Sequence, residues 1–212
     1  MNDTADDHLQ RVYTARDADE LARGYAAWAR QYDRDVMAMG YQTPAIVAGL
    51  MGRHVPASAT PVLDCGAGTG LVGLLLAGLG YRGLAAMDMS EPMLEVARAR
   101  GCYDDARVGV LGEHLDYPDD RFAAIVAAGV FTAGHAPATA FEEIARILAP
   151  GGIFIVSERV DADANADYRA QREALEARGA WRFVEQTELL TIFPLEPAEA
   201  ELRHRAFVYE GL

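Results

Sequence analysis

The chain has 212 residues and a formal net charge of −13, with 51% apolar and 24% charged residues. This length suits a single domain with a large core, and the excess of acids disfavours a nucleic-acid partner because it repels phosphate backbones. The two cysteines, Cys65 and Cys102, form no metal-binding pair, and no apolar run approaches the about 20 residues of a membrane span. We therefore expect one cytoplasmic domain over 1–212, without a metal or a membrane partner.

The N-terminal part of the chain is expected to form a helical cap. Residues 1–15 are polar and are expected to be loose chain. Within 17–39, apolar residues recur at the spacing of one helix face, and a further helix is expected over 41–50. The sequence therefore predicts a cap over 1–55 and a core over 56–212.

Strands and helices alternate along the predicted core. Strands are expected at 61–64, 84–88, 107–111, 122–127 and 152–158, and helices at 69–79, 91–99 and 138–148. This alternation predicts an α/β fold with a doubly wound, mostly parallel sheet. A helix over 167–178 and two late strands, 181–193 and 201–209, follow, which gives seven strands in all.

The most informative segment is a loop with glycine at every second position, directly after the first strand of the core. Gly66, Gly68 and Gly70 follow the acidic Asp64 at the end of that strand. Glycine lets the backbone turn sharply and approach a ligand closely. Dinucleotide sites need Gly-x-Gly-x-x-Gly, but Leu71 stands where the third glycine would fall, and no P-loop sequence follows. A nucleotide-dependent oxidoreductase is therefore disfavoured.

A second acid follows at the end of the next predicted strand. Asp88 lies 18 residues after Gly70, close to the interval at which such an acid binds a ribose. Its carboxylate would accept hydrogen bonds from both ribose hydroxyls. Ser90 and Pro92 mark a helix start directly afterwards, so capping of that helix is the alternative role. Ribose binding is the stronger interpretation, because strand end, acid and helix start coincide.

The motif Asp-x-Gly-x-Gly-x-Gly, from Asp64 to Gly70, resembles the first motif of the class I methyltransferases, which bind S-adenosylmethionine. The run from Tyr25 to Tyr41 is similar to the small Williams–Beuren-region methyltransferase-like family. The resemblance implies a Rossmann-like sheet with antiparallel C-terminal strands and an N-terminal helical lid. It fits the glycine spacing, because this cofactor has no phosphate and carries a sulfonium cation instead.

The resemblance also implies which residues hold the cofactor. They are Tyr25, Tyr32, Asp64, Gly66, Ala67, Gly68, Asp88, Met89, Met93, Leu111, Gly112, Glu113 and Ala128. On the adenine side the family often has an aspartate followed by a small residue, whereas this chain has Leu111 and Gly112. Backbone amides of Gly112 and Glu113 would then meet the adenine, and the Glu113 side chain would either accept from its amine or stay solvated.

Two residues are candidates for catalysis, Tyr32 and His135. Tyr25, Trp28 and Tyr32 are either core aromatics or a lid, since aromatic faces attract a sulfonium and a lid excludes water. The resemblance favours Tyr32 near the methyl group and Trp28 in the core, and it leaves both roles open for Tyr25. His135 follows the fourth strand, where it is either a general base or ordinary polar surface.

The implied reaction is direct in-line transfer of a methyl group that the sulfonium activates. The protein would align an acceptor and exclude water, with no nucleophilic side chain of its own. The expected acceptor is a small molecule held under the N-terminal helices, with a protein side chain as the alternative. A non-catalytic S-adenosylmethionine-binding module, with a sensing or scaffolding role, shares every binding residue and stays open as the second hypothesis.

Overall fold

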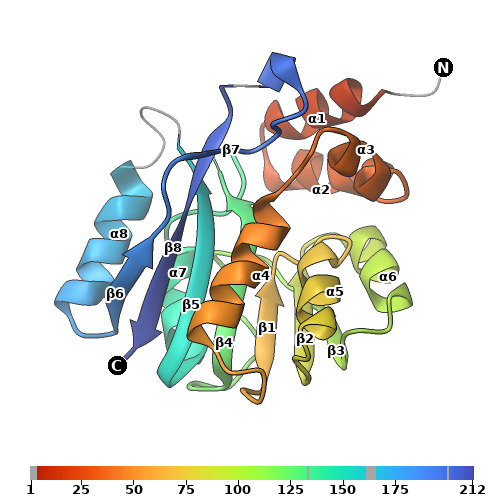
Figure 1. Cartoon of the computed structure of the whole chain (residues 1–212). Coiled ribbons are helices and arrows are strands. Elements are labelled where there is room, and N and C mark those ends of the chain that lie inside the picture. Colours follow the sequence, from red (N-terminus) through yellow and green to blue (C-terminus); the bar gives the residue numbers. More distant parts are fainter. Residues whose placement is uncertain (1–3, 133, 161–165, 200) are drawn as a thin grey trace.

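In the computed structural model of the chain, an eight-stranded sheet carries helices on both faces (Figure 1). The structure describes residues 4–132, 134–160, 166–199 and 201–212, and among these no helix is long and apolar enough to span a bilayer. The strands are β1 (Val62–Cys65), β2 (Leu84–Asp88), β3 (Asp105–Val108), β4 (Phe122–Phe131), β5 (Leu148–Arg159), β6 (Trp181–Gln186), β7 (Leu190–Thr191) and β8 (Arg203–Gly211). The helices are α1 (Ala5–Tyr13), α2 (Ala18–Trp28), α3 (Tyr32–Ala38), α4 (Thr43–His54), α5 (Leu71–Gly78), α6 (Glu91–Ala99), α7 (Ala140–Ile147) and α8 (Ala166–Ala177), with a 3₁₀ turn at Pro197–Glu199.

The sheet runs in the order β3-β2-β1-β4-β5-β8-β6, and β7 pairs with β8. Strands β1 to β5 pair with one another in parallel, whereas β8 is antiparallel to both β5 and β6. The predicted fold class is confirmed, as a doubly wound, mostly parallel sheet with antiparallel pairings at its C-terminal end. The strand order reverses between β1 and β4, which is where sheets of this kind bind their ligands.

The strand predicted over 181–193 is divided in the structure, which raises the strand number from the predicted seven to eight. At the break, the Thr187 N–H donates to the Ala206 carbonyl at 2.9 Å, and the Ala206 N–H donates to the Thr187 hydroxyl at 3.0 Å. The threonine side chain thus takes the place of a backbone carbonyl and interrupts the ladder. Beyond β7, Ile192 and Phe193 pack into the cap.

Alternate residues of the central strands face two different helix layers, as the period of a strand requires. Leu63, Ile125 and Phe154 belong to one core with residues of α7 and α8. Val62 and Ile155 belong to a second core with residues of α4 and α5. Figure 1 shows α4 and α5 on the near face of the sheet and α7 behind it. The central parallel strands β1 and β4 are therefore covered on both faces, and their ends are where a ligand can approach.

Helices α1, α2 and α3 lie above the carboxyl ends of the parallel strands (Figure 1). The expectation that residues 1–15 are loose is wrong where α1 forms, and its part over 1–3 lies outside the described residues. Thr4 and Asp7 make a capping box at its start, and Leu9 and Val12 are buried in the cap. The apolar pair three residues apart was too short a pattern to reveal this helix.

The two other predicted N-terminal helices differ from expectation in their bounds. The helix predicted over 17–39 is divided into α2 and α3 by a turn at 29–31. The helix predicted over 41–50 extends to His54 as α4. Since α4 packs against α5, β4 and β5, it covers the sheet, while α1 to α3 cover the strand ends.

Candidate functional site

A cavity of about 450 Å³ opens at the carboxyl edge of the parallel strands, beside α2. Its volume lies in the range of small-ligand sites, about 300–1,000 Å³. Its walls include the glycine loop after β1, the ends of β2 and β4, and the loop after β3. The predicted site residues that line it are Tyr25, Tyr32, Gly66, Gly68, Asp88, Met89, Met93, Leu111, Gly112, Glu113, Ala128 and His135.

The loop after β1 brings backbone to the cavity. Gly66 and Gly68 have φ angles of 73° and 54°, in the left-handed region that favours glycine. A Cβ at Gly66 would lie 2.4 Å from a methyl group of Val130, whereas a Cβ at Gly68 would meet nothing within 4 Å. The Gly66 and Ala67 N–H groups both donate to the Met87 carbonyl, at 2.7 and 2.9 Å, which fixes the loop against β2. The backbone at Gly68 therefore faces open space that a ligand can occupy.

Asp88 lies at the end of β2, on the wall of the cavity. Its Oδ2 accepts from the Gly68 N–H at 2.8 Å, and its Oδ1 accepts from the Ser90 N–H at 2.9 Å. Burial raises the pKa of this carboxyl, although the backbone N–H groups oppose the shift. Each carboxylate oxygen accepts more than one hydrogen bond. The cap-like contact with Ser90 and a ribose-binding role are therefore compatible.

Asp64 and Ala67 are both buried and, in the described part of the chain, do not line the cavity. Asp64 instead accepts a hydrogen bond of 2.5 Å from the Tyr103 hydroxyl, and burial raises the pKa of its carboxyl to about 7. The Tyr103 oxygen in turn accepts from the Gly73 N–H at 3.1 Å. Asp64 thus connects β1 to the first turn of α5 from behind the glycine loop. Tyr103, which the sequence analysis missed, follows no motif that would have marked it.

The loop after β3 closes another side of the cavity. β3 ends at Val108, earlier than predicted, so Leu111, Gly112 and Glu113 all lie in the loop. The Glu113 N–H donates to the Val110 carbonyl at 3.1 Å, which makes a tight turn. The side chain of Glu113 is exposed at the rim.

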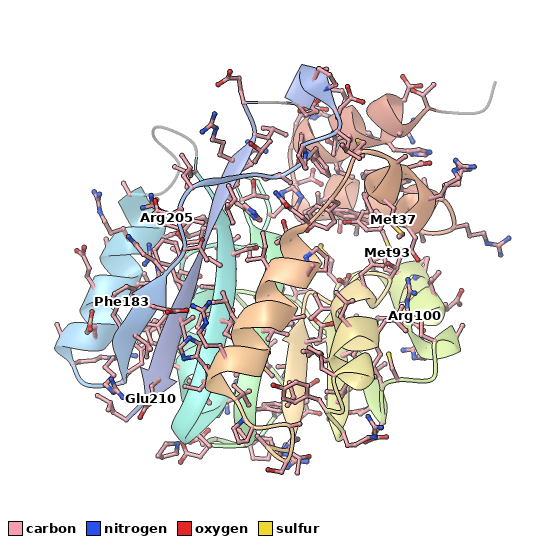
Figure 2. The ribbon with its side chains drawn as sticks, in the orientation of Figure 1. Met37, Met93, Arg100, Phe183, Arg205 and Glu210 are labelled. Atoms are coloured by element: carbon pink, nitrogen blue, oxygen red, sulfur yellow. The ribbon has the colours of Figure 1, made fainter. Side chains whose placement is uncertain are left out.

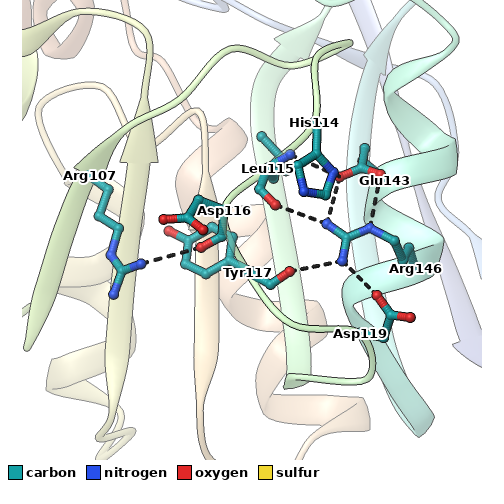
Figure 3. A network of polar contacts seen from close by, with 8 residues as sticks. All are labelled: Arg107, His114, Leu115, Asp116, Tyr117, Asp119, Glu143 and Arg146. Atoms are coloured by element: carbon teal, nitrogen blue, oxygen red, sulfur yellow. Dashed lines mark hydrogen bonds and ion pairs between the residues drawn. The ribbon is translucent and has the colours of Figure 1, made fainter.

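A polar network from α7 holds the continuation of this loop (Figure 3). The Arg146 guanidinium donates to the Leu115 and Tyr117 carbonyls at 2.9 and 2.8 Å. Glu143 accepts from the Leu115 N–H at 2.9 Å and pairs with Arg146 at 2.6 Å. The guanidinium holds the pKa of the Glu143 carboxyl down at about 2. The network therefore fixes the loop on its far side from the cavity.

Three aromatic rings pack together where the cap meets the cavity. The Tyr32 ring centre is 4.8 Å from that of Trp28 and 6.3 Å from that of Tyr25. Trp28 is 1% exposed and donates from Nε1 to Asp35 at 2.9 Å, so it is part of the cap core. Tyr25 and Tyr32 line the cavity, and burial raises the pKa of both phenols well above the usual value. Both hydroxyls therefore stay protonated at neutral pH.

His135 lines the cavity from the loop after β4. Its Nε2 lies 3.0 Å from the Tyr25 hydroxyl oxygen, and the two rings meet edge to face at 5.8 Å. This contact joins α2 to the strand edge across one side of the cavity. His135 therefore has a structural role, beside the base role predicted for it.

Comparison with known proteins identifies the family. A family model described as a methyltransferase domain matches residues 63–156, which carry the glycine loop and Asp88. Methyltransferase-like protein 27 of Homo sapiens is 32% identical over 181 residues, which cover 81% of this chain and 73% of that protein. The chain belongs to the class I methyltransferases. The predicted resemblance to the class I methyltransferases is thus confirmed, and this relative is itself a methyltransferase-like protein.

Other methyltransferases match over less sequence or at lower identity. Demethylmenaquinone methyltransferase of Clavibacter sepedonicus is 36% identical over 105 residues, which cover 49% of this chain and 42% of that protein. A TehB-like methyltransferase from Corynebacterium glutamicum superposes with a TM-score of 0.64 at 21% identity, over 90% of this chain and 100% of that one. The putative methyltransferase solved with the Haloferax volcanii Trm112 activator superposes with a TM-score of 0.63 at 21% identity, over 93% of this chain and 99% of that one. At such identities these structures show the shared fold.

This methyltransferase has a second, smaller cavity of about 40 Å³ between the cap and the strand ends. Tyr25, Tyr32 and Gly129 line both cavities. Gly129 has a φ of 74°, and a Cβ there would lie 2.3 Å from the Tyr41 hydroxyl oxygen, so only glycine fits this shared wall. The polar residues of the small cavity that the sequence analysis missed are Thr43, Thr132, Ser157 and His204. They come from four separate segments, and no local motif links them.

Proposed function

We propose that this methyltransferase uses S-adenosylmethionine, bound in the larger cavity, for direct in-line transfer of a methyl group to a small-molecule acceptor. The observation that carries the proposal is the convergence of the glycine loop, Asp88 and the loop after β3 on one cavity of about 450 Å³. We place the reaction in the cytoplasm, because Cys65 and Cys102 are free thiols.

The residues of the cavity fit this cofactor in three places. The open space at Gly68 would admit the amino-acid end, where the backbone approaches without a side chain. The remaining lone pairs of Asp88 would accept from the ribose hydroxyls. The Gly112 amide would meet the adenine edge, and the Glu113 carboxylate would accept from the adenine amine, because the Glu113 N–H already donates to the Val110 carbonyl. When bound, S-adenosylmethionine supplies a methyl group that its sulfonium activates.

The protein's own contribution is orientation and exclusion of water. Tyr25 and Tyr32, whose rings would face the sulfonium, stay neutral and therefore attract a cation without neutralising it. The Tyr25–His135 contact closes one side of the cavity against solvent. Holding two reactants in line contributes about 7–11 kcal/mol in well-organised sites. We assign Tyr32 to the positioning of the methyl group and His135 to the role of a base within reach of the acceptor.

Cofactor choice is tested by calorimetry with S-adenosylhomocysteine and, separately, with NAD. We expect S-adenosylhomocysteine to bind and NAD not to bind. Tight binding of NAD alone would overturn the assignment, and Asp88→Ala serves as the binding-deficient control.

Catalysis is tested with S-adenosylmethionine that carries a deuterated methyl group. The protein is incubated with the small-molecule fraction and with the protein fraction of a cell extract, and mass spectrometry follows the label. Label in the small-molecule fraction supports the proposal, whereas label in proteins alone would make a side chain the acceptor. Cofactor binding without any transfer would favour the non-catalytic module.

A further inference from the structure

Two residues that line the small cavity of about 40 Å³ each carry a buried polar atom without a partner in the described part of the chain. His204 on β8 and Thr132 after β4 both line it, and they are 2% and 6% exposed. Among the described residues, the His204 Nε2 and the Thr132 Oγ1 have no hydrogen-bond partner. Buried polar groups are nearly always hydrogen-bonded, so two such atoms on residues that line one cavity point to a molecule that binds there.

The orientation of His204 is fixed by its other nitrogen. Nδ1 lies 3.0 Å from the Thr43 hydroxyl oxygen on α4, so the ring is held between the cap side and β8. Burial lowers the pKa of this imidazole to about 4. The ring is therefore neutral at physiological pH, and it offers Nε2 to the cavity as a hydrogen-bonding group without charge.

Among the described residues, the wall of the cavity is largely aromatic and contains no carboxylate. Its aromatic members include Tyr13, Tyr25, Trp28, Tyr32, Tyr41 and Phe193. The charged member is Arg159, whose guanidinium lies 4.8 Å from the centre of the Tyr13 ring. A cation bound here would lie near this guanidinium and would find no carboxylate among the described lining residues as a counter-ion, which disfavours a charged amine.

The size and the position of the cavity limit what it can hold. A volume of about 40 Å³ exceeds the roughly 10–15 Å³ that one water needs, but it is well below the 150 Å³ that holds benzene in a dry engineered cavity. Because Tyr25, Tyr32 and Gly129 line both cavities, the two adjoin, and a group inside the small one lies next to the place proposed for the methyl group.

We propose that the small cavity binds the acceptor end of an uncharged small molecule, and that His204 and Thr132 are the hydrogen-bond partners of its hydroxyl, thiol or neutral amine. This inference rests on the proposed function and assigns the substrate class of the same site. The cavity accepts only a few heavy atoms, so a larger acceptor would insert its reactive end and leave the remainder outside.

The proposal is tested with two probes of equal shape that differ in charge, 2-propanol and the isopropylammonium ion. Each is titrated into the protein with and without S-adenosylhomocysteine. Resonances of the His204 ring and of the Thr132 methyl group are followed by NMR. We expect saturable shifts at both residues with 2-propanol and none with isopropylammonium. Stronger binding of the cation, or no saturable shift with the alcohol, would overturn the proposal.

Two variants test the two contacts separately. In Thr132→Val the titration is followed at the His204 ring, and in His204→Phe it is followed at the Thr132 methyl group. Thr132→Val, which keeps the shape, and His204→Phe should each weaken 2-propanol binding by about threefold to tenfold, the effect of one lost hydrogen bond. Their affinity for S-adenosylhomocysteine should stay within about twofold, since the changes lie outside the larger cavity. Unchanged binding of 2-propanol in both variants would overturn the proposal.

Tyr117→Phe is the matched control, because the Tyr117 hydroxyl is also buried without a partner but lies outside both cavities. Thr132→Val and Tyr117→Phe should both keep or raise the stability of the protein, whereas only Thr132→Val should weaken probe binding. If His204→Phe fails to fold, the affinity of Thr132→Val for 2-propanol alone tests the proposal. Absence of S-adenosylhomocysteine binding would contradict the proposed function, while the titrations of the free protein would still decide on the small cavity.

Discussion

The Thr69 hydroxyl donates a hydrogen bond of 2.6 Å to Asp33 Oδ1, which ties the cap helix α3 to the glycine loop. Arg100 completes the contact from the end of α6 (Figure 2): it pairs with Asp33 Oδ2 and donates to the Thr69 carbonyl at 2.5 Å. Thr69 is buried, and Asp33 and Arg100 are mostly shielded from solvent. The position of the cap and the position of the loop are therefore coupled.

Arg100→Met is expected to weaken binding of S-adenosylhomocysteine by about threefold to tenfold, because the glycine loop loses a charge-assisted contact. Calorimetry provides the measurement. Arg98→Met is the control, since Arg98 is on the same helix and makes an exposed ion pair with Glu91. Equal affinities for the two variants would show that the cap contact does not support the cofactor site.

Asp88→Ala is expected to reduce the affinity for S-adenosylhomocysteine by at least about tenfold, because it removes the acceptor for Gly68 and the proposed ribose ligand. Asp88→Asn keeps one acceptor oxygen and should lose less. The dissociation constants of all three proteins are compared by calorimetry. If Asp88→Ala binds as tightly as the natural protein, the carboxylate serves only the local backbone.

Arg146→Met is expected to lower the free energy of unfolding by about 2–3 kcal/mol, because Glu143 and two loop carbonyls lose their partner (Figure 3). Urea unfolding provides the measurement. Arg182→Met, which breaks an exposed pair with Glu210, is the matched control and should change stability by less than about 1 kcal/mol. Similar losses in both variants would contradict a special role for the network.

Asp64 is expected to make the stability of the protein depend on pH. Its pKa is about 7 when folded, against an ordinary value of 3.8, so the folded state binds the additional proton between these values. Stability from this group is thus present at low pH and is lost as the pH rises from about 4 to about 7, by on the order of 2–4 kcal/mol.

The dependence on Asp64 is isolated by urea unfolding of the natural protein and Asp64→Asn at several pH values. The difference between their free energies of unfolding should fall with rising pH across this window. The same comparison with Asp116→Asn, at an exposed aspartate, is the control. A difference that is constant with pH would show that Asp64 is not protonated in the folded protein.

Site residues that belong to a local sequence pattern at a strand end could be predicted. Gly66 and Gly68 sit directly after β1, and Asp88 ends β2, so local patterns were enough to place them at one sheet edge. Asp64 has the same local signal, yet its side chain points to Tyr103, a partner 39 residues away. The division into a cap over 1–55 and a core over 56–212 stays a prediction. Within the predicted cap, α4 packs on the sheet, whereas α1 to α3 cover the strand ends.

Contacts between distant segments were out of reach of sequence patterns. The pairing of Thr43 with His204 spans 161 positions, and the contact of Tyr25 with His135 spans 110. The sequence analysis named Tyr25 and His135 singly, but nothing in the sequence pairs them or links Thr43 to His204, and only the folded topology joins each pair. The helix α1 was missed for another reason: its buried residues are few, and its polar ones dominate the composition.

The two cavities are supplied by different stretches of the polypeptide. Most of the larger one is drawn from the segment 63–156, which the family model covers. Much of the smaller one is supplied by the chain's outer portions, from Leu9 to Thr43 and from Ile192 to His204. Under the proposed function, substitutions in those flanks, apart from Tyr25 and Tyr32 that line both cavities, would retune which molecule receives the methyl group and leave the binding of the donor intact.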